Sequence, residues 1–297
     1  MGPKTMRATL NHPKPFFDYF ALTKPRVTLM VVLTALFGFY LGAQGEMDFI
    51  LLFHTLLGTA LVAGGTSALN QYFERDLDAK MLRTRHRPLP AGRLTPGAAL
   101  AFGVSISVLG IVYLILLVNA LTGLLAAITL ISYVFLYTPL KQKSSLSTII
   151  GAIPGALPPM GGWTAVRNEI GVEAWILFAI LFLWQLPHFL AIAWIYRDDY
   201  ARGGFRMLTV IDPEGGSAGR QIIANCIALL SVSLLPTLIG LTGIVYFVTA
   251  LLLGLAFLSA GIGVIVSRNV AAAQRLMRAS LVYLPALLGV MAWDKTF

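Results

Sequence analysis

Runs of about 20 apolar residues recur along the whole of this 297-residue chain, and they constrain its fold more than any other feature. A run of this length spans the hydrocarbon core of a bilayer as one α-helix. Lipid offers the backbone no hydrogen bonds, so helices fit these runs, whereas a transmembrane barrel would need short alternating segments. Only 12% of the residues are charged, about half the usual share in a soluble domain. The sequence therefore predicts one all-α, polytopic membrane domain over residues 1–297.

The apolar runs predict nine membrane-spanning helices. Their approximate ranges are 27–43, 50–72, 98–118, 121–137, 146–165, 173–195, 221–240, 243–266 and 278–293. The fifth is the weakest, because Pro154, Pro158 and Pro159 interrupt it. Proline is tolerated inside a membrane helix where neighbouring groups satisfy the freed carbonyls, so this helix is predicted to line the interior.

The net charge of +9 could suggest a nucleic-acid partner, but its distribution indicates membrane topology instead. Of the 22 Lys and Arg residues, 20 fall in the N-terminal tail (1–25 and Arg26) or in the even-numbered connections between spans. Those in the tail are Lys4, Arg7, Lys14, Lys24 and Arg26. Only Arg167 and Lys295 fall on the other face. This bias predicts a cytoplasmic N-terminus and an external C-terminus, with anionic lipid or a phosphorylated substrate, and no nucleic acid, as the partner of the basic side.

Polar residues at the end of the second run form the first candidate site. Asn70, Glu74 and Asp78 follow one another at intervals of four, so they share one face of a helix. Oxygen-bearing side chains arranged in this way can ligate Mg²⁺. Asp76 points elsewhere and is predicted to pair with Lys80. The alternative is an ordinary charged helix end, although like charges four residues apart are destabilising unless a cation lies between them.

A second acidic segment follows the sixth run, where Asp198 and Asp199 stand at the cytoplasmic end of a span. The two connections, about 73–97 and 196–220, are predicted to face each other across a cavity as parts of two related halves. Carboxylates that hold a metal, together with cations that neutralise phosphate oxygens, suit a metal-bridged diphosphate. The cations proposed for this role are Arg83, Arg87, Lys141, Arg202 and Arg206. The alternative role for each of them is membrane topology alone.

His188 is the sharpest polar outlier within the predicted membrane region, in a segment that includes Trp184 and Gln185. A polar side chain at such depth usually faces an interior cavity and marks function, and the alternative is a satisfied hydrogen bond between helices. His12, His54 and His86 are less informative, because they lie in the tail, near the outer face and in the basic connection. The single cysteine, Cys226, makes no internal disulfide.

These residues carry a resemblance to a known family. The run Asn70, Glu74, Asp78 is similar to the Asn/Asp-x-x-x-Asp-x-x-x-Asp signature of the UbiA-type intramembrane prenyltransferases, with Glu74 in place of the usual Asp. Five further motifs resemble the branch that farnesylates protohaem IX, and the resemblance runs from Thr23 to the ninth span. They are Met81-x-Arg83-Thr84-x-x-Arg87-Pro88-Leu89, Tyr137-Thr138-x-Leu140-Lys141, Gly155-Ala156-x-Pro158-Pro159-x-Gly161, Trp184-Gln185-x-Pro187-His188-Phe189 and Asp199-Tyr200-x-x-Gly203-Gly204-x-x-Met207-Leu208.

The resemblance implies a nine-helix UbiA-like bundle with a cavity that opens near the cytoplasmic leaflet. Farnesyl diphosphate would bind through Mg²⁺ to the acidic segments, with Asn70, Glu74, Asp78, Asp198 and Asp199 as metal ligands. A vinyl group of protohaem IX would accept the farnesyl group, water would add, and haem O would form. His188, as axial ligand or propionate neighbour, would contact the haem together with Gln185 and Trp184. The 26-residue segment before the first span is too short for a transit peptide, which favours a bacterial inner membrane over a mitochondrial one. A haem A synthase or terminal oxidase assembly factor is predicted as a further partner.

Two other functions remain open at this point. One keeps the class and changes the acceptor to an aromatic compound of quinone or chlorophyll synthesis. The second is a multi-pass transporter, which would place its ionisable residues near the middle of the membrane rather than at the helix ends.

Overall fold

The computed structural model describes residues 15–296, and these are almost entirely helical. Within that range the only β-type contact is a single antiparallel bridge between Thr242 and Lys295, so the all-α prediction is confirmed. The helices are α1 (Pro15–Leu22), α2 (Pro25–Gly42), α3 (Phe49–Asp78), α4 (Pro96–Leu117), α5 (Ala120–Ile131), η1 (Ser132–Tyr137), α6 (Thr138–Lys143), α7 (Ser147–Arg167), α8 (Val172–Ile195), α9 (Arg197–Arg202), α10 (Leu208–Ile211), α11 (Gly216–Leu238), α12 (Ile244–Ser267) and α13 (Val270–Trp293).

Eight helices in the described range are long and apolar enough to cross a membrane. One of them is continuous from Ala120 to Lys143 and combines α5, η1 and α6. The segment with three internal prolines is fully helical as α7, but α7 is not among the eight. The predicted count of nine spans and the predicted orientation of the termini therefore stay predictions.

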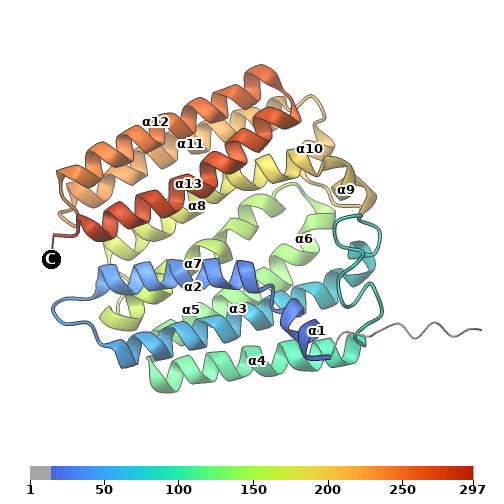
Figure 1. The fold of residues 1–297 in the computed structure, drawn as a ribbon, viewed down its shortest axis with the longest axis horizontal. Coiled ribbons are helices and arrows are strands. Elements are labelled where there is room, and N and C mark those ends of the chain that lie inside the picture. Colours follow the sequence, from blue (N-terminus) through green and yellow to red (C-terminus); the bar gives the residue numbers. More distant parts are fainter. Residues whose placement is uncertain (1–14, 297) are drawn as a thin grey trace, which may run out of the picture.

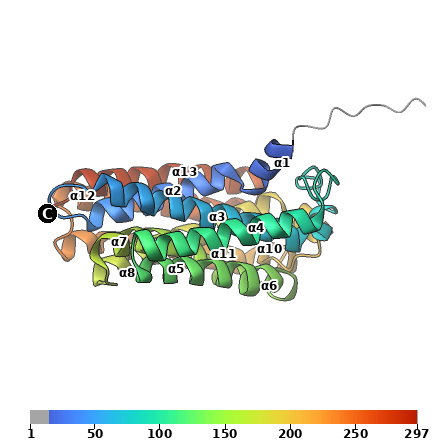
Figure 2. The same ribbon diagram turned by 90° about the horizontal axis from the view of Figure 1, so that it is seen from below.

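The long helices run side by side along the longest axis of the molecule (Figures 1 and 2). In Figure 1 the helices α2 to α5 form one side, α11 to α13 form the other, and α7 and α8 lie between them. The packing between helices follows this order, with α3 against α4, α2 against α7, α7 against α8, α8 against α11 and α13, and α12 against α11 and α13. The middle pair therefore contacts both sides of the bundle.

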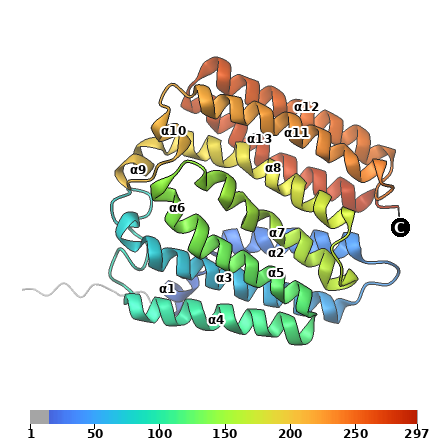
Figure 3. The ribbon, with the colours of Figure 1, turned by 180° about the vertical axis from the view of Figure 1, so that it is seen from behind.

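The connections that carry most of the basic residues gather at one end of the bundle. There, α1, the connection after α3, the α6–α7 turn and the segment with α9 and α10 lie together, whereas the C-terminus lies at the opposite end (Figures 1 and 3). The alternation of the connections between two ends thus agrees with the charge pattern in the sequence. Of the basic residues counted in the tail, Lys4, Arg7 and Lys14 lie outside the described residues, as does His12.

Helix α7 approaches α2 very closely because glycines remove the intervening side chains. A Cβ at Gly38 would lie 1.9 Å from the Pro159 carbonyl oxygen, and one at Gly162 would lie 1.9 Å from the Ala35 carbonyl oxygen. Small residues that let backbones meet are typical of packed membrane helices. The proline-rich helix is therefore an interior helix, as its composition predicts.

A π-helical turn, η1, interrupts the span that begins at Ala120. It comes just before Pro139, which has no N–H to donate to the preceding turn. The Thr138 N–H reaches back to the Tyr133 carbonyl, and the Thr138 hydroxyl donates to the same oxygen at 2.9 Å. Such turns often occur at functional positions, and this one brings Thr138 and Lys141 to face α3.

Candidate active site

The end of α3 buries the three side chains that the sequence places on one face. Asn70, Glu74 and Asp78 are 1%, 4% and 1% exposed. Asp76 lies on the other side of the helix, and its side chain is 82% exposed. The helix continues through Asp78, so the three side chains keep the spacing of successive turns.

The predicted ion pair between Asp76 and Lys80 is wrong. Asp76 instead faces Arg75, with 3.7 Å between the nearest nitrogen and oxygen. Helix α3 ends at Asp78, so Lys80 lies beyond the last turn and lacks the i, i+4 geometry that the prediction assumed.

Each of the three buried side chains on α3 contacts a cation, and the three cations come from three different segments. The contacts are Lys24 Nζ to Asn70 Oδ1 at 2.9 Å, Lys141 Nζ to Glu74 Oε1 at 2.7 Å, and Arg87 Nη1 to Asp78 Oδ2 at 2.6 Å. Thr138 adds a hydroxyl that accepts from Asn70 Nδ2 at 3.2 Å. Two of these contacts are ion pairs that neutralise the buried carboxylates of Glu74 and Asp78, and the third is a hydrogen bond from Lys24 to the neutral amide of Asn70.

Lys24 is the functional candidate that sequence reasoning missed, because it was counted only toward topology. Its backbone adopts the left-handed conformation, with φ 47° and ψ 66°, which is uncommon for a residue other than glycine. Strained residues of this kind cluster at functional sites. Burial, together with the nearby Arg87 charge, lowers the pKa of Lys24 to about 7. Its position between α1 and Pro25, directly before the first membrane span, could have indicated from the sequence that Lys24 lies at the site.

Asp199 joins the second acidic segment to the first. It lies on α9, is 7% exposed, and accepts hydrogen bonds from the backbone N–H groups of Leu82 and Arg83 at 3.1 and 3.2 Å. Arg202 donates to the same carboxylate. Burial opposes ionisation of Asp199, but the bonds from Arg202, Leu82 and Arg83 outweigh it and lower the pKa of the carboxyl group. The connection after α3 and helix α9 therefore meet, as Figure 1 also shows.

Two of the predicted site residues are not brought to this cluster. The Asp198 side chain is 85% exposed and lies 3.8 Å from Arg197. Arg206 is exposed, and it is its backbone N–H, rather than its side chain, that contacts the site region, by donating to the Lys141 carbonyl at 2.8 Å. Neighbouring positions in a short helix point in different directions, which residue spacing in a loop cannot predict.

Arg83 and Arg87 have different surroundings, although both come from the connection after α3. Arg87 is bound to Asp78, whereas the Arg83 guanidinium lies over the rings of Tyr196 and Tyr200, 5.3 and 5.9 Å from their centroids. The Arg83 side chain is exposed at the surface of the site. Arg87 is therefore part of the buried cation row and Arg83 is not.

The donor set fits a hard divalent cation in its chemistry. Asp78 Oδ1 is buried and has no hydrogen-bond partner among residues 15–296. Carboxylate and amide oxygens are the ligands that Mg²⁺ prefers. Within the same range no three His, Cys, Asp or Glu side chains already converge on one point. Metal binding here would thus require the carboxylates to exchange their present cation partners.

The segment around His188 contacts two neighbouring helices. Gln185 is buried and its Nε2 donates to the Ala152 carbonyl of α7 at 2.7 Å. Trp184 Nε1 donates to the Ser280 carbonyl of α13 at 2.9 Å, and His188 Nδ1 lies 2.6 Å from Ser280 Oγ. The hydrogen bond between helices, the alternative role for His188, is therefore present. No sequence spacing relates Ser280 to His188, so this partner was not predictable.

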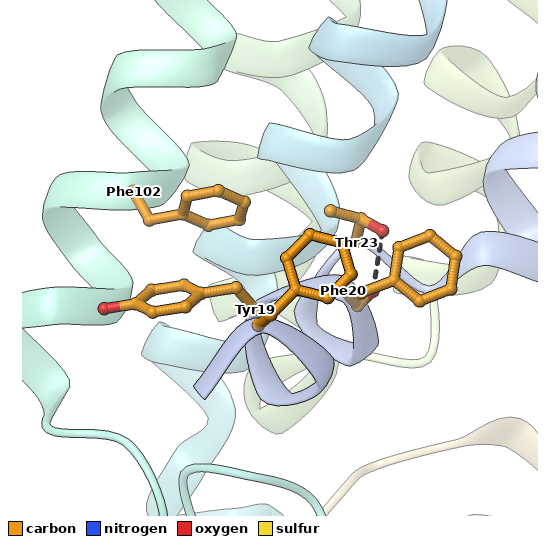
Figure 4. Close-up of a pocket in the computed structure, with 5 residues that line it drawn as sticks. Tyr19, Phe20, Thr23 and Phe102 are labelled. Atoms are coloured by element: carbon orange, nitrogen blue, oxygen red, sulfur yellow. Dashed lines mark hydrogen bonds between the residues drawn. The ribbon is translucent and has the colours of Figure 1, made fainter. Parts of the chain in front are cut away.

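An apolar pocket of about 350 Å³ lies apart from the cluster, between α1 and α4 (Figure 4). Its lining is mainly aromatic and includes Tyr19, Phe20 and Phe102, together with Thr23. The lining has no charged side chain, so the pocket suits hydrocarbon and not diphosphate.

Comparison with known proteins defines the class to which this fold and site belong. Residues 31–284 match the UbiA prenyltransferase family. A solved digeranylgeranylglyceryl phosphate synthase has the same fold, with a TM-score of 0.80 at 16% identity over 94% of this chain and 98% of that one. A UbiA homologue from Archaeoglobus fulgidus, solved bound to GPP and Mg²⁺, gives a TM-score of 0.69 at 16% identity over 92% of this chain and 99% of that one.

Two curated relatives narrow the class. The chain is 48% identical to a protein from Solibacter usitatus named protoheme IX farnesyltransferase, over 94% of this chain and 98% of the relative. It is 44% identical to a protein of the same name from Koribacter versatilis, over 94% and 93%. The chain therefore belongs to the UbiA prenyltransferase family, within the branch whose curated members are named protoheme IX farnesyltransferase. Membership of a transferase family sets the transporter alternative aside.

Proposed function

We propose that this protein transfers the farnesyl group of farnesyl diphosphate to a vinyl group of protohaem IX, with addition of water, to give haem O and diphosphate. The observation that carries the proposal is the row of Lys24, Lys141 and Arg87 against the oxygens of α3, at one end of an apolar bundle. The relatives named for this reaction support the choice of donor and acceptor. We place the protein in a bacterial inner membrane, with this end in the cytoplasm.

In the proposal, Mg²⁺ is held by Asn70, Glu74, Asp78 and Asp199. When bound, the ion would withdraw charge from the diphosphate and so favour its departure. The unpartnered Asp78 Oδ1 is the oxygen most ready to accept a cation. The exposed carboxylate of Asp198 and the exposed side chain of Arg206 have no part in this set.

The cations that now neutralise the carboxylates would turn to the diphosphate oxygens. With the metal held by the oxygens of α3, Lys24, Lys141 and Arg87 would be free to turn from Asn70, Glu74 and Asp78 to the diphosphate, so each cation would keep an oxygen partner. Arg202 lies against Asp199 and Arg83 lies at the surface, where both can contact the outer phosphate. Donors placed before the reaction stabilise the charge that develops on the leaving group at little reorganisation cost.

The reaction begins when the allylic C–O bond of farnesyl diphosphate breaks and its electron pair leaves with the diphosphate. The vinyl π-electrons of protohaem IX then form the new C–C bond to the farnesyl carbon. Water adds to the cationic carbon next to the porphyrin and loses a proton, which leaves a hydroxyethylfarnesyl group. The apolar helix walls keep water from the farnesyl cation before the vinyl group reaches it.

The segment with Trp184, Gln185 and His188 would form the acceptor side of the site. Gln185 joins α8 to α7, and Trp184 joins α8 to α13, so these two side chains would hold the helices between which the porphyrin would bind. His188 is the side chain of the three that would contact the haem iron. Association with a haem A synthase or an oxidase assembly factor stays a prediction.

The test is the product formed by purified protein in lipid nanodiscs with Mg²⁺, farnesyl diphosphate and protohaem IX. We expect the mass of the haem to increase by one farnesyl group and one hydroxyl group, and no product when the metal is chelated. Unchanged protohaem, together with prenylation of a phenolic acceptor in a parallel reaction, would refute the proposed acceptor and leave the class intact.

A further inference from the structure

His188 is held by a polar contact to Ser280 on α13 and by a ring contact to Trp184 on its own helix, α8. Its Nδ1 lies 2.6 Å from Ser280 Oγ. Its ring stacks on Trp184, with centroids 5.2 Å apart and planes at 15°, and Trp184 in turn donates to the Ser280 carbonyl. Ser280 is fully buried, and its hydroxyl also lies 2.6 Å from the Met277 carbonyl. Ser280 therefore sets the positions of both rings.

The position of the imidazole proton follows from counting donors. The Ser280 hydroxyl has one proton, and the Met277 carbonyl can only accept it. If Ser280 donates to Met277, its oxygen accepts from His188 Nδ1–H, and every donor is satisfied. If Ser280 instead donates to Nδ1, the proton of His188 moves to Nε2, which has no hydrogen-bond partner among the described residues. Ser280 Oγ and the Met277 carbonyl oxygen lie 2.6 Å apart, and two oxygens at that distance need a proton between them, so the first arrangement is favoured.

We infer that Ser280 is a positioning residue that holds His188 with its proton on Nδ1, so that Nε2 presents a lone pair as the ligand of the protohaem iron. The inference rests on the proposed function and names the contact through which the acceptor binds. In metal sites a histidine ligand commonly donates its other N–H to a fixed oxygen, which sets the ring orientation and makes the ligating nitrogen more basic. Ser280 supplies such an oxygen here.

The place of His188 along α8 suits this role. It stands seven residues before the end of the helix at Ile195, or about 10 Å by the rise of an α-helix. Asp199 follows directly beyond that end, on α9. A porphyrin whose iron is bound at His188 can therefore direct one of its vinyl groups toward the end of the bundle where the cations lie.

The experiment measures binding of protohaem alone to the full-length protein in nanodiscs, by absorbance and by the iron–histidine Raman band of the ferrous complex. Four variants are compared: His188→Gln, Ser280→Ala, Ser280→Thr and Ser233→Ala. Ser233 is a matched control, because it is also fully buried and its hydroxyl lies 2.9 Å from the Tyr283 hydroxyl on the same helix as Ser280. Haem O formation is assayed separately for each variant.

We expect wild type to show the iron–histidine band and His188→Gln to lack it. Ser280→Ala should lower the band frequency and weaken haem binding by about 10- to 100-fold, the usual cost of removing such a partner. Ser280→Thr, which keeps the hydroxyl, should restore the band, and Ser233→Ala should leave it unchanged. The inference is overturned if wild type lacks the band, if Ser280→Ala leaves it unchanged, or if Ser233→Ala changes it equally. A wild-type protein that shows the band but forms no haem O would instead refute the proposed reaction.

Discussion

The two acidic segments meet at the same end of the bundle, but they are built differently. The α3 segment belongs to a 30-residue helix and buries Asn70, Glu74 and Asp78 on one face. The α9 segment is a helix of six residues that turns Asp199 inward and leaves the Asp198 side chain 85% exposed. The α3 face contacts three cations, whereas Asp199 is bound mainly by Arg202 and by backbone N–H groups of the connection after α3.

This difference suggests that the two segments have different roles in the site. A long helix whose site face is buried holds the side chains of that face in fixed positions, which suits the binding of a metal and a diphosphate. A short helix that is attached through Asp199 to Leu82 and Arg83 can fix the connection that carries Arg87. We therefore expect substitutions on α3 to have the larger effect on binding and chemistry, and substitutions of Asp199 on α9 to act both through the metal and by loosening that connection.

The largest effect is expected at the end of the α3 face. Asp78→Ala removes both the unpartnered oxygen and the partner of Arg87, so turnover should fall at least about a thousandfold, or about 4 kcal/mol. Turnover is measured as the initial rate of haem O formation at saturating substrate concentrations. Asp76→Asn, on the exposed side of the same helix, is the control and should stay within about twofold of wild type. Equal losses of turnover in the two variants would contradict the assignment of the site to the buried face of α3.

The buried ion pair of Lys141 and Glu74 is expected to contribute to the free energy of unfolding. Lys141→Met leaves the Glu74 carboxylate buried and uncompensated, which should lower the free energy of unfolding by about 3 kcal/mol. Adding Glu74→Leu should recover most of that loss, because a buried ion pair can be replaced by apolar groups of similar size, yet the double variant should remain inactive. The free energies of unfolding of Lys141→Met and of the double variant are measured in detergent micelles. A double variant no more stable than Lys141→Met would argue against a direct ion pair.

A smaller effect is expected on α9, where only one of two adjacent carboxylates faces inward. Asp199→Asn weakens hydrogen bonds to a charged acceptor, each worth about 1.5 to 3 kcal/mol, so activity should fall about 30-fold. Asp198→Asn should change it by less than about twofold. Steady-state rates at several Mg²⁺ concentrations provide the test, and a loss in Asp198→Asn as large as that in Asp199→Asn would restore Asp198 to the metal site.

The smallest effects on activity are expected from replacing Arg87 or Arg83 by lysine, and the two losses should differ in size. Lysine keeps the charge but loses the planar fork of arginine, so Arg87→Lys should lower activity about tenfold, or about 1.4 kcal/mol. Arg83→Lys should lower it only about threefold, or about 0.7 kcal/mol, because Arg83 is exposed and stacks on Tyr196 and Tyr200. Both variants keep the charge bias that sets topology. Wild-type rates in both would show that these arginines serve topology alone.

The sequence predicted what depends on local periodicity. The helical spacing of Asn70, Glu74 and Asp78 gave one face, and the prolines of 146–165 indicated the interior position of α7. It could not predict contacts made between segments far apart in the chain. Lys24 reaches Asn70 from 46 residues away, and Ser280 reaches His188 from 92 residues away. The inward turn of Asp199 and the outward turn of Asp198 depend on how α9 packs, which no spacing encodes.

The central claim is that the α3 face and its cations form a metal-dependent diphosphate site. Calorimetric titration of inorganic diphosphate into the protein in nanodiscs, with and without Mg²⁺, tests it most directly. The account predicts binding that requires Mg²⁺ in wild type and in Asp76→Asn, and no measurable binding in Asp78→Ala. Binding that is independent of Mg²⁺, or that is equal in Asp78→Ala and Asp76→Asn, would contradict it.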